Sequence, residues 1–472
     1  MESIECSLMA SSGGRAEIDP EFVFHSCLQV MGNCVKNSPA GKYKPAGVGI
    51  SCHMHSLMLA DREGKPLTNL MTWADNRAAA EAGYIAENFD AGDLYARTGC
   101  RVQHPLYPLS KLLWFKRNEP ETFRAAYKYI TIKEYIVFRL FGLYAVDYTL
   151  ASCQGYYNIH TQKWDSRILG DILGITAEKL SEVVECTHVF RGFRPEYESV
   201  LGMSSDTPFV VGSGDGIMAN IGCGVCDGTS FSSTIGTSGA IRTAVDKPLL
   251  DPLQRTWCYS FTKDMWVAGG AINNGGIILK WLREEFRQQF EYDAADGESI
   301  YALFDRFAGG IPAGSEGLVF LPYLTGERCP DWNANARGLM YGLGYTHGRK
   351  HIIRAAMEGV MYRLFSVYEV LSGLGNSAAR IMANGGYARS ELWLQIQADL
   401  FNREVLISGV TEASALGAAY TAMLALGAVG DIKAGLPAME PRKAIGPIKE
   451  NTGVYRQMYD TAMRIYNSIY SV

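Results

Sequence analysis

Three features of this sequence could take part in chemistry. They are a carboxylate between two glycines, two glycine-rich turns, and a group of polar side chains beside an aromatic ring. Asp215 stands between Gly214 and Gly216 and follows the apolar run 208–213. Open α/β sheets bind ligands outside the carboxyl ends of their strands, where a carboxylate can accept a proton from a hydroxyl that attacks phosphorus. Asp215 could equally cap a helix that begins near Ile217. The local sequence favours neither interpretation.

Two glycine-rich turns have the composition of a phosphate or nucleotide site. Gly236-Thr-Ser-Gly239 lies at the tip of a predicted hairpin, where backbone N–H groups can converge on phosphate oxygens and Thr237 adds a hydroxyl. The turn at 385–390 follows a strand-like segment and opens a helix, so its glycine pair permits close approach of a flat ligand. Each turn alone is more often a plain connector. The sequence lacks Gly-x-x-x-x-Gly-Lys-Ser/Thr, which excludes a P-loop.

The segment Trp73-Ala-Asp-Asn-Arg77 gathers an aromatic ring, a carboxylate and a guanidinium within a few residues. This mixture suits a polyol or a sugar acid: a ring covers C–H faces, a carboxylate accepts from hydroxyls, and arginine binds a carboxylate through two N–H groups. On chemistry alone, however, a helix start with solvated charges is the favoured explanation.

Two short motifs have metal-ligand residue types, Cys52-His-Met-His55 and Cys223-Gly-Val-Cys226. Neither has a second ligand pair at zinc spacing, so we do not expect a metal site at either. In an extended segment His53 and His55 would face the same side. A polar contact with a substrate therefore competes there with a structural role.

Composition restricts the class of protein. The chain has 472 residues, with 44 Lys+Arg against 49 Asp+Glu, a net charge of −5. This balance argues against a nucleic-acid footprint, and the length suggests two or three domains. The 11 cysteines are irregularly spaced and no export signal precedes them, which predicts reduced thiols in the cytoplasm. The uncharged stretch 413–430 is rich in Ala and Gly, which favours a buried helix over a membrane span.

Apolar periodicity predicts the elements that hold these residues. Glycine turns between apolar runs favour an α/β protein, with a boundary in the region 212–228. The predicted strands are 48–51, 56–59, 208–213, 229–235 and 240–245, the last two forming the hairpin. The predicted helices are 111–117, 133–141, 279–286, 351–371, 390–401 and 414–426.

Taken in order, these segments resemble the carbohydrate kinases of the FGGY family, and within it the members that act on gluconate. The matching segments are 14–24, 49–77, 105–121, 129–152, 210–224, 233–242, 273–286, 321–333, 338–359, 384–405 and 412–422. Nearly the whole chain is covered, and so many motifs in one order are specific.

The resemblance implies an α/β fold of two actin-like (ribonuclease H-like) domains that flank a central cleft. Residues 1–224 would form the sugar-binding domain and 225–472 the ATP-binding domain. The implied activity transfers the γ-phosphate of ATP, with Mg²⁺, to the C6 hydroxyl of D-gluconate and gives 6-phosphogluconate. A xylulokinase-like pentulose kinase is the alternative. The implied partners are a sugar acid and ATP, without nucleic acid or membrane, and a homodimer is possible.

The resemblance also implies roles for particular residues. Asp215 would be the general base. The sugar site would be lined by Met54, His55, Trp73, Asp75 and Arg77. Phosphates would bind at Gly236, Thr237 and Ser238, with Gly276 and Lys280 nearby. The adenosine would lie beside Gly385, Gly386, Tyr387 and Ser390. No residue is assigned to a metal.

One departure from the family concerns the start of the chain. Family members open with a hairpin reading Gly-Ile-Asp-x-Gly-Thr-Thr, whose aspartate assists Mg²⁺ and whose turn binds phosphate. The resemblance here begins later, with Met1-Glu-Ser-Ile in the place of the third strand. It predicts a first sheet without strands beside 48–51 and little phosphoryl transfer by this chain alone. A catalytically inactive sugar- or nucleotide-binding protein is the corresponding alternative.

Overall fold

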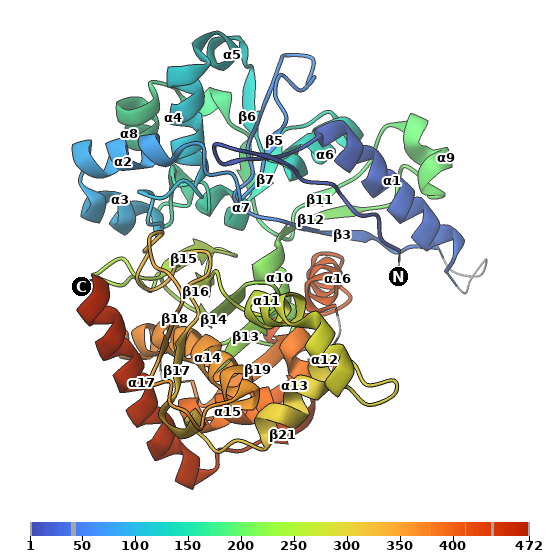
Figure 1. Cartoon of the computed structure of the whole chain (residues 1–472). Helices are drawn as coiled ribbons and strands as arrows, with labels where there is room; N and C mark the ends of the chain where they lie inside the picture. The colour runs from blue at the N-terminus through green and yellow to red at the C-terminus, as the bar shows by residue number, and fades with distance from the viewer. Residues whose placement is uncertain (1, 39–43, 377, 411, 436–438, 471–472) are drawn as a thin grey trace. The chain divides into compact units, whose positions relative to one another are not determined.

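The computed structural model describes residues 2–38, 44–376, 378–410, 412–435 and 439–470. Its contacts divide the chain into two compact units, each made of several segments. Unit 1 comprises Met1–Gly222, Asp246–Val267 and Glu412–Gly435. Unit 2 comprises Cys223–Val245, Ala268–Thr411 and Leu436–Val472. Both units mix helices and strands (Figure 1).

The strands of unit 1 are β1 (Met9–Ser11), β2 (Arg15–Ile18), β3 (Val48–Cys52), β4 (Met58–Ala60), β5 (Leu70–Met71), β6 (Lys128–Ile130), β7 (Ala145–Asp147), β8 (Tyr157–Asn158), β9 (Lys163–Trp164), β10 (Glu182–Val184), β11 (Val189–Phe190), β12 (Phe209–Gly214) and β15 (Trp257–Ser260). Its helices are α1 (Pro20–Lys36), α2 (Ala79–Asn88), α3 (Ala91–Thr98), α4 (Pro108–Asn118), α5 (Pro120–Ala125), α6 (Ile132–Phe141), α7 (Tyr148–Ser152), α8 (Ser166–Ile168), α9 (Glu198–Leu201), α10 (Asp215–Gly222) and α16 (Ala413–Ala425).

The strands of unit 2 are β13 (Ser230–Ile235), β14 (Gly239–Val245), β16 (Trp266–Ile272), β17 (Val319–Leu321), β18 (Leu339–Tyr341), β19 (Arg380–Gly385), β20 (Glu404–Ser408) and β21 (Pro441–Ile445). Its helices are α11 (Ile277–Glu285), α12 (Arg287–Asp293), α13 (Ile300–Gly309), α14 (Arg349–Gly373), α15 (Glu391–Phe401) and α17 (Lys449–Tyr470).

A three-stranded sheet with the order β11-β12-β3 carries the site of unit 1. β12 is parallel to β3 and antiparallel to β11. Gly212 lies in an irregularity of β12 with φ +60°, and a Cβ atom there would lie 1.8 Å from the carbonyl oxygen of Ile50. Only glycine fits this position. The apolar core beneath the sheet is formed largely by α1, α6 and β12, through residues such as Phe24, Tyr135 and Val211.

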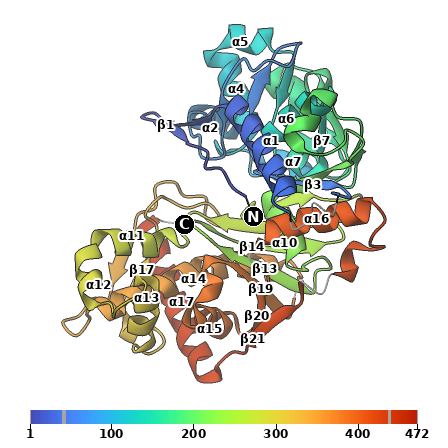
Figure 2. The ribbon, with the colours of Figure 1, turned by 90° about the vertical axis from the view of Figure 1, so that its right-hand side faces the viewer.

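Two helices in contact, α10 and α16, support the ends of β3 and β12 (Figure 2). A Cβ atom on Gly222 of α10 would lie 1.9 Å from the carbonyl oxygen of Ala413, and one on Gly417 of α16 would lie 1.9 Å from that of Met218. These glycines let the two backbones touch. α16 also packs directly on β3, where a Cβ atom on Gly49 would lie 2.3 Å from a carbonyl oxygen of α16.

The main sheet of unit 2 has β16, β14, β13, β19, β20 and β21 in that order. β13 and β14 form the predicted antiparallel hairpin, and β13 and β20 flank β19 in parallel. The 25-residue helix α14 is buried on nearly all sides, in contact with α11, α13, α15, β14 and β17 (Figure 1). The turns that follow β13 and β19 therefore leave the same edge of the sheet.

Most predicted elements are confirmed within a few residues. Local chain signals explain several boundaries: Asp19 caps α1 ahead of Pro20, and Thr131 and Glu134 form a capping box on α6. The strand expected at 56–59 is shorter and later, as β4, because pairing with β6 begins only at Met58.

The expectation for the first residues was wrong in one respect. Residues 2–8 have no regular secondary structure, although Met1-Glu-Ser-Ile was predicted to form a strand. A strand requires a neighbour to satisfy its backbone groups, and the part of the chain that the structure describes supplies none there. Within the same residues β3 pairs with β12 alone, so its other edge carries no strand.

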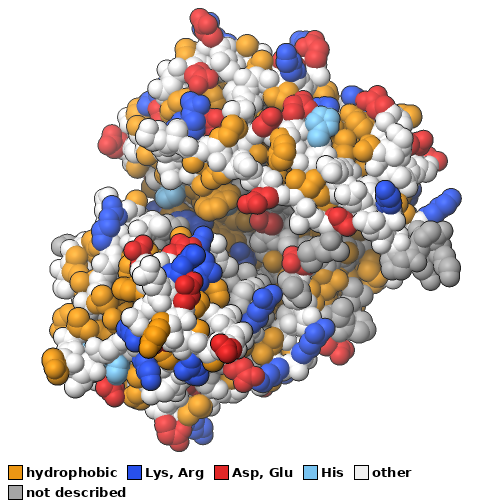
Figure 3. Space-filling view, turned by 45° about the vertical axis from the view of Figure 1, so that its right-hand side comes forward, with side chains coloured by type: hydrophobic (Ala, Val, Ile, Leu, Met, Phe, Trp, Pro, Cys, Tyr) orange, Lys and Arg blue, Asp and Glu red, His pale blue; other side chains and the backbone are white. Residues whose placement is uncertain are grey.

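Positive and negative side chains are interspersed over the face drawn in Figure 3. That pattern agrees with the mild net charge of −5. Among the described residues, each helix is too short or too polar to cross a bilayer, and this includes α16.

Candidate active site

The ends of β3 and β12 bring two chain segments to one edge of the sheet in unit 1. Cys52 pairs with Gly214 in parallel register, so His53 and Asp215 are the next residues to leave the two strands. Ligands of α/β sheets bind at this edge. Segment 53–55 and Asp215 therefore form one half of the candidate site.

Asp215 begins α10 and its side chain is exposed. Its Oδ1 accepts a hydrogen bond from the Gly216 N–H at 2.7 Å. The Ser414 hydroxyl donates to its backbone carbonyl at 3.2 Å and lies 2.6 Å from the Ser51 hydroxyl. The carboxylate thus faces solvent from a backbone held by α16 and β3. The helix expected to begin near Ile217 begins at Asp215 itself.

Met54 packs against the residue that precedes Asp215. A Cβ atom on Gly214 would lie 2.7 Å from Met54 Cγ and 2.8 Å from its Sδ. The absence of a side chain at Gly214 therefore lets the predicted sugar-binding segment approach the predicted base.

His55 adopts an unusual backbone conformation. Its φ is +64°, in the left-handed region that side chains other than glycine rarely adopt, and such positions concentrate at functional sites. The imidazole is buried, with Nε2 3.0 Å from the Tyr259 hydroxyl and edge contacts to the rings of Tyr107 and Tyr259. This backbone turn also means that His53 and His55 do not lie in one extended strand, as the sequence pattern suggested.

His53 is a candidate that sequence reasoning left unassigned. Its Nε2 is buried and forms no hydrogen bond with the described residues. Burial lowers the pKa of His53, although the negative charge of Asp215 acts in the opposite direction. His53 therefore places near the predicted base a buried ring nitrogen that has no hydrogen-bond partner in the part of the chain that the structure describes. The signal that could have found it is the pairing of β3 with β12, which aligns it with Asp215.

The segment 73–77 divides into an exposed ring and a buried ion pair. The Trp73 side chain is 51% exposed, as a stacking surface for a ligand would be. Asp75 is fully buried; it accepts from the Ala16 N–H at 2.8 Å and from Arg77 Nη2 at 2.9 Å. Arg77 also hydrogen-bonds Glu17. A sugar role for Asp75 and Arg77 stays a prediction, because both already bind protein partners.

The Arg77 guanidinium is held from several directions. Its carbon lies 4.9 Å from the ring centre of Trp114. Burial opposes its charge, but the hydrogen bonds and negative charges of Asp75 and Glu17 outweigh burial and raise the pKa of Arg77. A substrate carboxylate would have to share this cation with two protein carboxylates.

In unit 2, the β13–β14 turn packs against a second glycine pair. The N–H groups of Gly275 and Gly276 donate to the carbonyls of Thr237 (3.1 Å) and Gly236 (2.7 Å). A Cβ atom on Gly275 would lie 2.6 Å from the Ser238 carbonyl, which leaves no room for another residue. The structure thus brings four predicted residues into contact: Gly236, Thr237, Ser238 and Gly276. It also places Gly275 in this group, a residue that the sequence analysis did not select.

Lys280 lies one turn into α11, where its backbone N–H donates to Gly276 at 3.0 Å. Its side chain is exposed, and Nζ is 3.9 Å from Glu284. The ammonium is therefore available to a phosphate on the solvent side of the turn.

The turn at 385–386 lies next to the β13–β14 turn. Gly385 pairs with Ile235 in parallel register. Its φ is +91°, and a Cβ atom there would lie 2.6 Å from the Ile235 carbonyl oxygen. The predicted phosphate and adenosine turns are thereby brought together at one edge of the unit 2 sheet.

The other two predicted adenosine residues differ in exposure. Tyr387 is buried, and its hydroxyl bonds Ser233 Oγ (2.9 Å) and Gln397 Oε1 (2.7 Å), which places the ring beneath the turn. Ser390 caps α15 and donates to Asp305 Oδ1 at 2.6 Å. Burial raises the pKa of Asp305. Asp305 is a further polar group at this turn that the sequence did not indicate.

We predict that Gly385→Ala raises the KM for ATP about tenfold. Gly385 has φ +91° and ψ −172°, a region that essentially only glycine adopts, so alanine there is strained by about 1–3 kcal/mol. Its methyl group would also press on the Ile235 carbonyl and move the phosphate turn. Steady-state kinetics measure the change. Gly309→Ala is the matched control, because Gly309 ends α13 with nothing within 4 Å of an added Cβ atom. An unchanged KM for ATP in Gly385→Ala would contradict the assignment.

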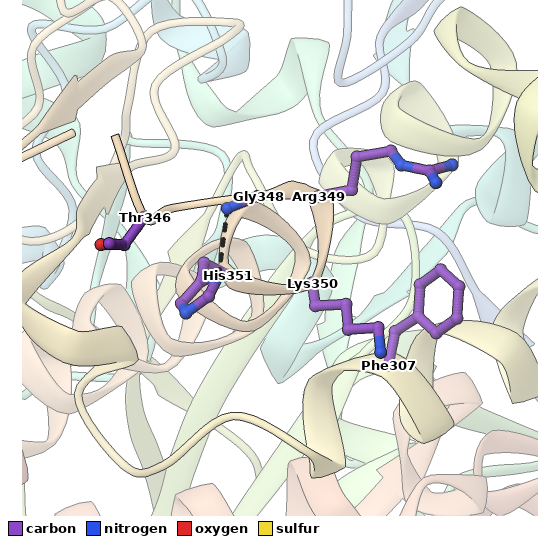
Figure 4. Close-up of a pocket in the computed structure, with 6 residues that line it drawn as sticks. All are labelled: Phe307, Thr346, Gly348, Arg349, Lys350 and His351. Carbon is purple, nitrogen blue, oxygen red and sulfur yellow. Dashed lines mark hydrogen bonds between the residues drawn. The ribbon is translucent and has the colours of Figure 1, made fainter. Parts of the chain in front are cut away.

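A separate hollow on unit 2 lies between α13 and the start of α14 (Figure 4). It is lined by Phe307, Thr346, Gly348, Arg349, Lys350 and His351. The Gly348 N–H donates to His351 Nδ1 at 3.2 Å, and Lys350 lies over the Phe307 ring. No sequence-predicted site residue lines this hollow. Over the part of the chain that the structure describes, no three His, Cys, Asp or Glu side chains gather as metal ligands.

Comparison with known families defines the class of this protein. Residues 1–222 match the N-terminal domain of the FGGY family of carbohydrate kinases, and residues 231–426 match its C-terminal domain. The two α/β units and their glycine turns agree with the two-domain, actin-like architecture that the resemblance implied, and that expectation is confirmed. The chain belongs to the FGGY family of carbohydrate kinases, which are ATP-dependent sugar phosphotransferases.

Individual relatives are similar along nearly their whole length. A gluconokinase of Bacillus licheniformis is 39% identical over 97% of this chain and 89% of its own. A gluconokinase of Bacillus subtilis (strain 168) is also 39% identical, whereas a xylulose kinase of that strain is 28% identical over 97% of this chain and 90% of its own.

Two solved structures from Lactobacillus acidophilus share the fold at 34% identity. A ligand-bound xylulose kinase superposes with a TM-score of 0.92, and a gluconate kinase with 0.91. Each comparison covers 98% of this chain and 92% of the other.

Proposed function

We propose that this protein is a gluconate kinase that transfers the γ-phosphoryl group of ATP to the C6 hydroxyl of D-gluconate, giving 6-phosphogluconate and ADP. Identity to relatives carries the substrate assignment: 39% to two gluconokinases against 28% to a xylulose kinase. In this proposal unit 1 binds the sugar and unit 2 binds ATP. The expected domains were residues 1–224 and 225–472, whereas unit 1 also includes residues 246–267 and 412–435.

Asp215 accepts the proton from the C6 hydroxyl as that oxygen bonds to the γ-phosphorus and the bond to the ADP oxygen breaks. Its exposed carboxylate at the end of β12 supports this role. Trp73 offers a face for the C–H groups of the sugar, while Met54 and His55 line the segment beside the base. His53 supplies one more ring nitrogen.

On the nucleotide side, the turns at 236–238, 275–276 and 385–386 hold the phosphates and the adenosine. Lys280 adds a positive charge near the phosphates. Mg²⁺ would arrive with ATP and neutralise charge on its phosphates; such sites often use few protein ligands, so the lack of a ligand cluster among the described residues is compatible with it.

A xylulose kinase is the second candidate. The xylulose kinase from Lactobacillus acidophilus resembles this chain as closely in fold and identity as the gluconate kinase from that organism does. An acidic substrate needs a cation, whereas a neutral pentulose does not. The engagement of Arg77 by Asp75 and Glu17 is therefore the observation that keeps this alternative open.

We further propose that the protein acts in the cytoplasm, where ATP is abundant. The 11 cysteines support this setting, because none of them forms a disulfide bond in the part of the chain that the structure describes. Association of two copies stays a prediction.

A screen of C5 and C6 polyols, ketoses and sugar acids with ATP and Mg²⁺ tests the assignment. We expect D-gluconate to give the highest kcat/KM. A coupled assay for ADP measures turnover on every substrate in the same way. Highest kcat/KM with xylulose would overturn the gluconate assignment and leave the kinase class in place.

A further inference from the structure

Lys111 of α4 is fully buried and forms no ion pair with a carboxylate among the described residues. Its Nζ instead donates to two backbone carbonyls, His55 O at 2.8 Å and Thr72 O at 2.6 Å. His55 belongs to segment 53–55, and Thr72 immediately precedes segment 73–77; these two segments carry the proposed sugar contacts. The Lys111 ammonium therefore links the two segments, 53–55 and 73–77, which are the two walls of the proposed sugar site.

Backbone pairing between the two walls ends close to Lys111. Leu57 and Met71 form an antiparallel bridge through two backbone hydrogen bonds, 3.0 and 2.8 Å long. Beyond this bridge the segments no longer pair with each other, and His55 turns away with φ +64°. The Lys111 ammonium links the two segments just beyond this bridge, where, among the residues that the structure describes, they share no backbone hydrogen bond.

A role in packing alone does not account for this arrangement. Burying an ammonium is costly, and an apolar side chain of similar volume would fill the same space at lower cost. Burial lowers the pKa of Lys111 to about 7, although the negative charge of Asp75 acts in the opposite direction; the positive charge of Arg77 lowers the pKa further. Lys111 in turn helps to lower the pKa of His53. At this position the Lys111 side chain donates to backbone carbonyls beside both segments, which an apolar side chain could not do.

We propose that Lys111 is a positioning residue of the sugar site, whose buried ammonium sets the spacing between segment 53–55 and segment 73–77. This inference rests on the proposed sugar role of those segments. It does not depend on which sugar is bound.

The test compares Lys111→Met with the wild type, using whichever sugar the substrate screen identifies. We expect the KM for the sugar to rise about tenfold or more, because two charge-assisted hydrogen bonds are lost and the walls can separate. The KM for ATP should stay within about twofold, because the nucleotide turns belong to unit 2. Lys111→Arg keeps a charged donor and should recover part of the sugar affinity.

Lys116→Met is the matched control. Lys116 lies on the same helix and also donates to a backbone carbonyl, that of Ile172 at 3.4 Å, away from segments 53–55 and 73–77. Its kinetics should equal those of the wild type. A folded Lys111→Met protein with an unchanged sugar KM would overturn the proposal. Failure of gluconate as substrate would instead overturn the proposed function and leave this test intact.

The pH dependence of the wild type gives a second readout that needs no variant. Between pH 7 and the ordinary pKa of lysine, the unfolded chain binds more protons at this residue than the folded chain, so its contribution to stability improves as pH rises. The ammonium, however, is lost over the same range. If the charge of Lys111 positions the two segments, sugar affinity falls as the pH rises from 6.5 to 8.5. If the Lys111 side chain only fills space, sugar affinity does not fall. Constant sugar affinity, measured by calorimetry without ATP, would contradict the proposal even if Lys111→Met does not fold.

Discussion

Asp215→Asn is expected to lower kcat by about 10²–10⁴ while the affinity for the sugar stays within a few-fold of the wild type. Asparagine has the same shape, and its side-chain oxygen can still accept from the Gly216 N–H, so the start of α10 is preserved. The amide cannot take up the proton of the attacking hydroxyl. Steady-state kinetics measure the loss of turnover, and calorimetry without ATP measures the sugar affinity.

Asp206→Asn serves as the control for this variant. Asp206 is an exposed aspartate of unit 1 that lies before β12, and its replacement should leave kcat unchanged. Near-normal turnover in Asp215→Asn would remove Asp215 from its role as base. Loss of sugar binding together with turnover would indicate a damaged site and not a missing base.

Arg77→Ala is expected to lower the free energy of unfolding by about 3–5 kcal/mol. The Asp75 side chain is fully buried and that of Glu17 nearly so. Among the described residues, the substitution would leave Asp75 without an ion-pair partner and would remove the closer of the two cations of Glu17, whose remaining partner is Arg15 at 3.6 Å. Urea denaturation followed by circular dichroism measures the change. Arg77→Lys should be intermediate, because lysine restores the charge but not the several parallel hydrogen bonds.

The same variant tests whether Arg77 also binds the substrate. If it does, the preference for sugar acids over neutral polyols falls in the fraction of Arg77→Ala that remains folded. Unchanged stability would contradict the ion-pair network. Unchanged substrate preference would contradict only the sugar role.

Local patterns were sufficient for the elements that carry the site. Short-range periodicity predicted β3, β12 and the β13–β14 hairpin, and the glycines around Asp215 pointed to the end of a strand. These signals depend on neighbours in sequence. The resemblance to the FGGY family then supplied the roles, because it orders many such motifs at once.

Contacts between distant segments could not be predicted from such patterns. Asp75 and Arg77 looked like free polar groups, since nothing nearby indicates that Glu17 and the Ala16 N–H would engage them. Tyr387 looked like a ligand contact, but its hydroxyl is satisfied by Ser233 and Gln397. The left-handed backbone of His55 is likewise set by packing, not by local preference.

The division of the chain into two units also depends on contacts between distant segments, which local patterns do not predict. The segments 246–267 and 412–435 belong to unit 1, although they lie far along the sequence. For the second segment, the cause is the close contact of α16 with α10 and β3 through Gly417, Gly222 and Gly49. A uniform Ala- and Gly-rich helix carries no local sign of which helix it will touch.

An internal competition tests the central claim most directly. D-Gluconate and D-xylulose at equal concentration are incubated with the protein, ATP and Mg²⁺, and the phosphorylated products are resolved by ³¹P and ¹³C NMR. The ratio of early products equals the ratio of the two kcat/KM values. We predict that 6-phosphogluconate predominates, with the phosphoryl group on C6. Predominance of xylulose phosphate, or a phosphoryl group at another position of gluconate, would contradict the account.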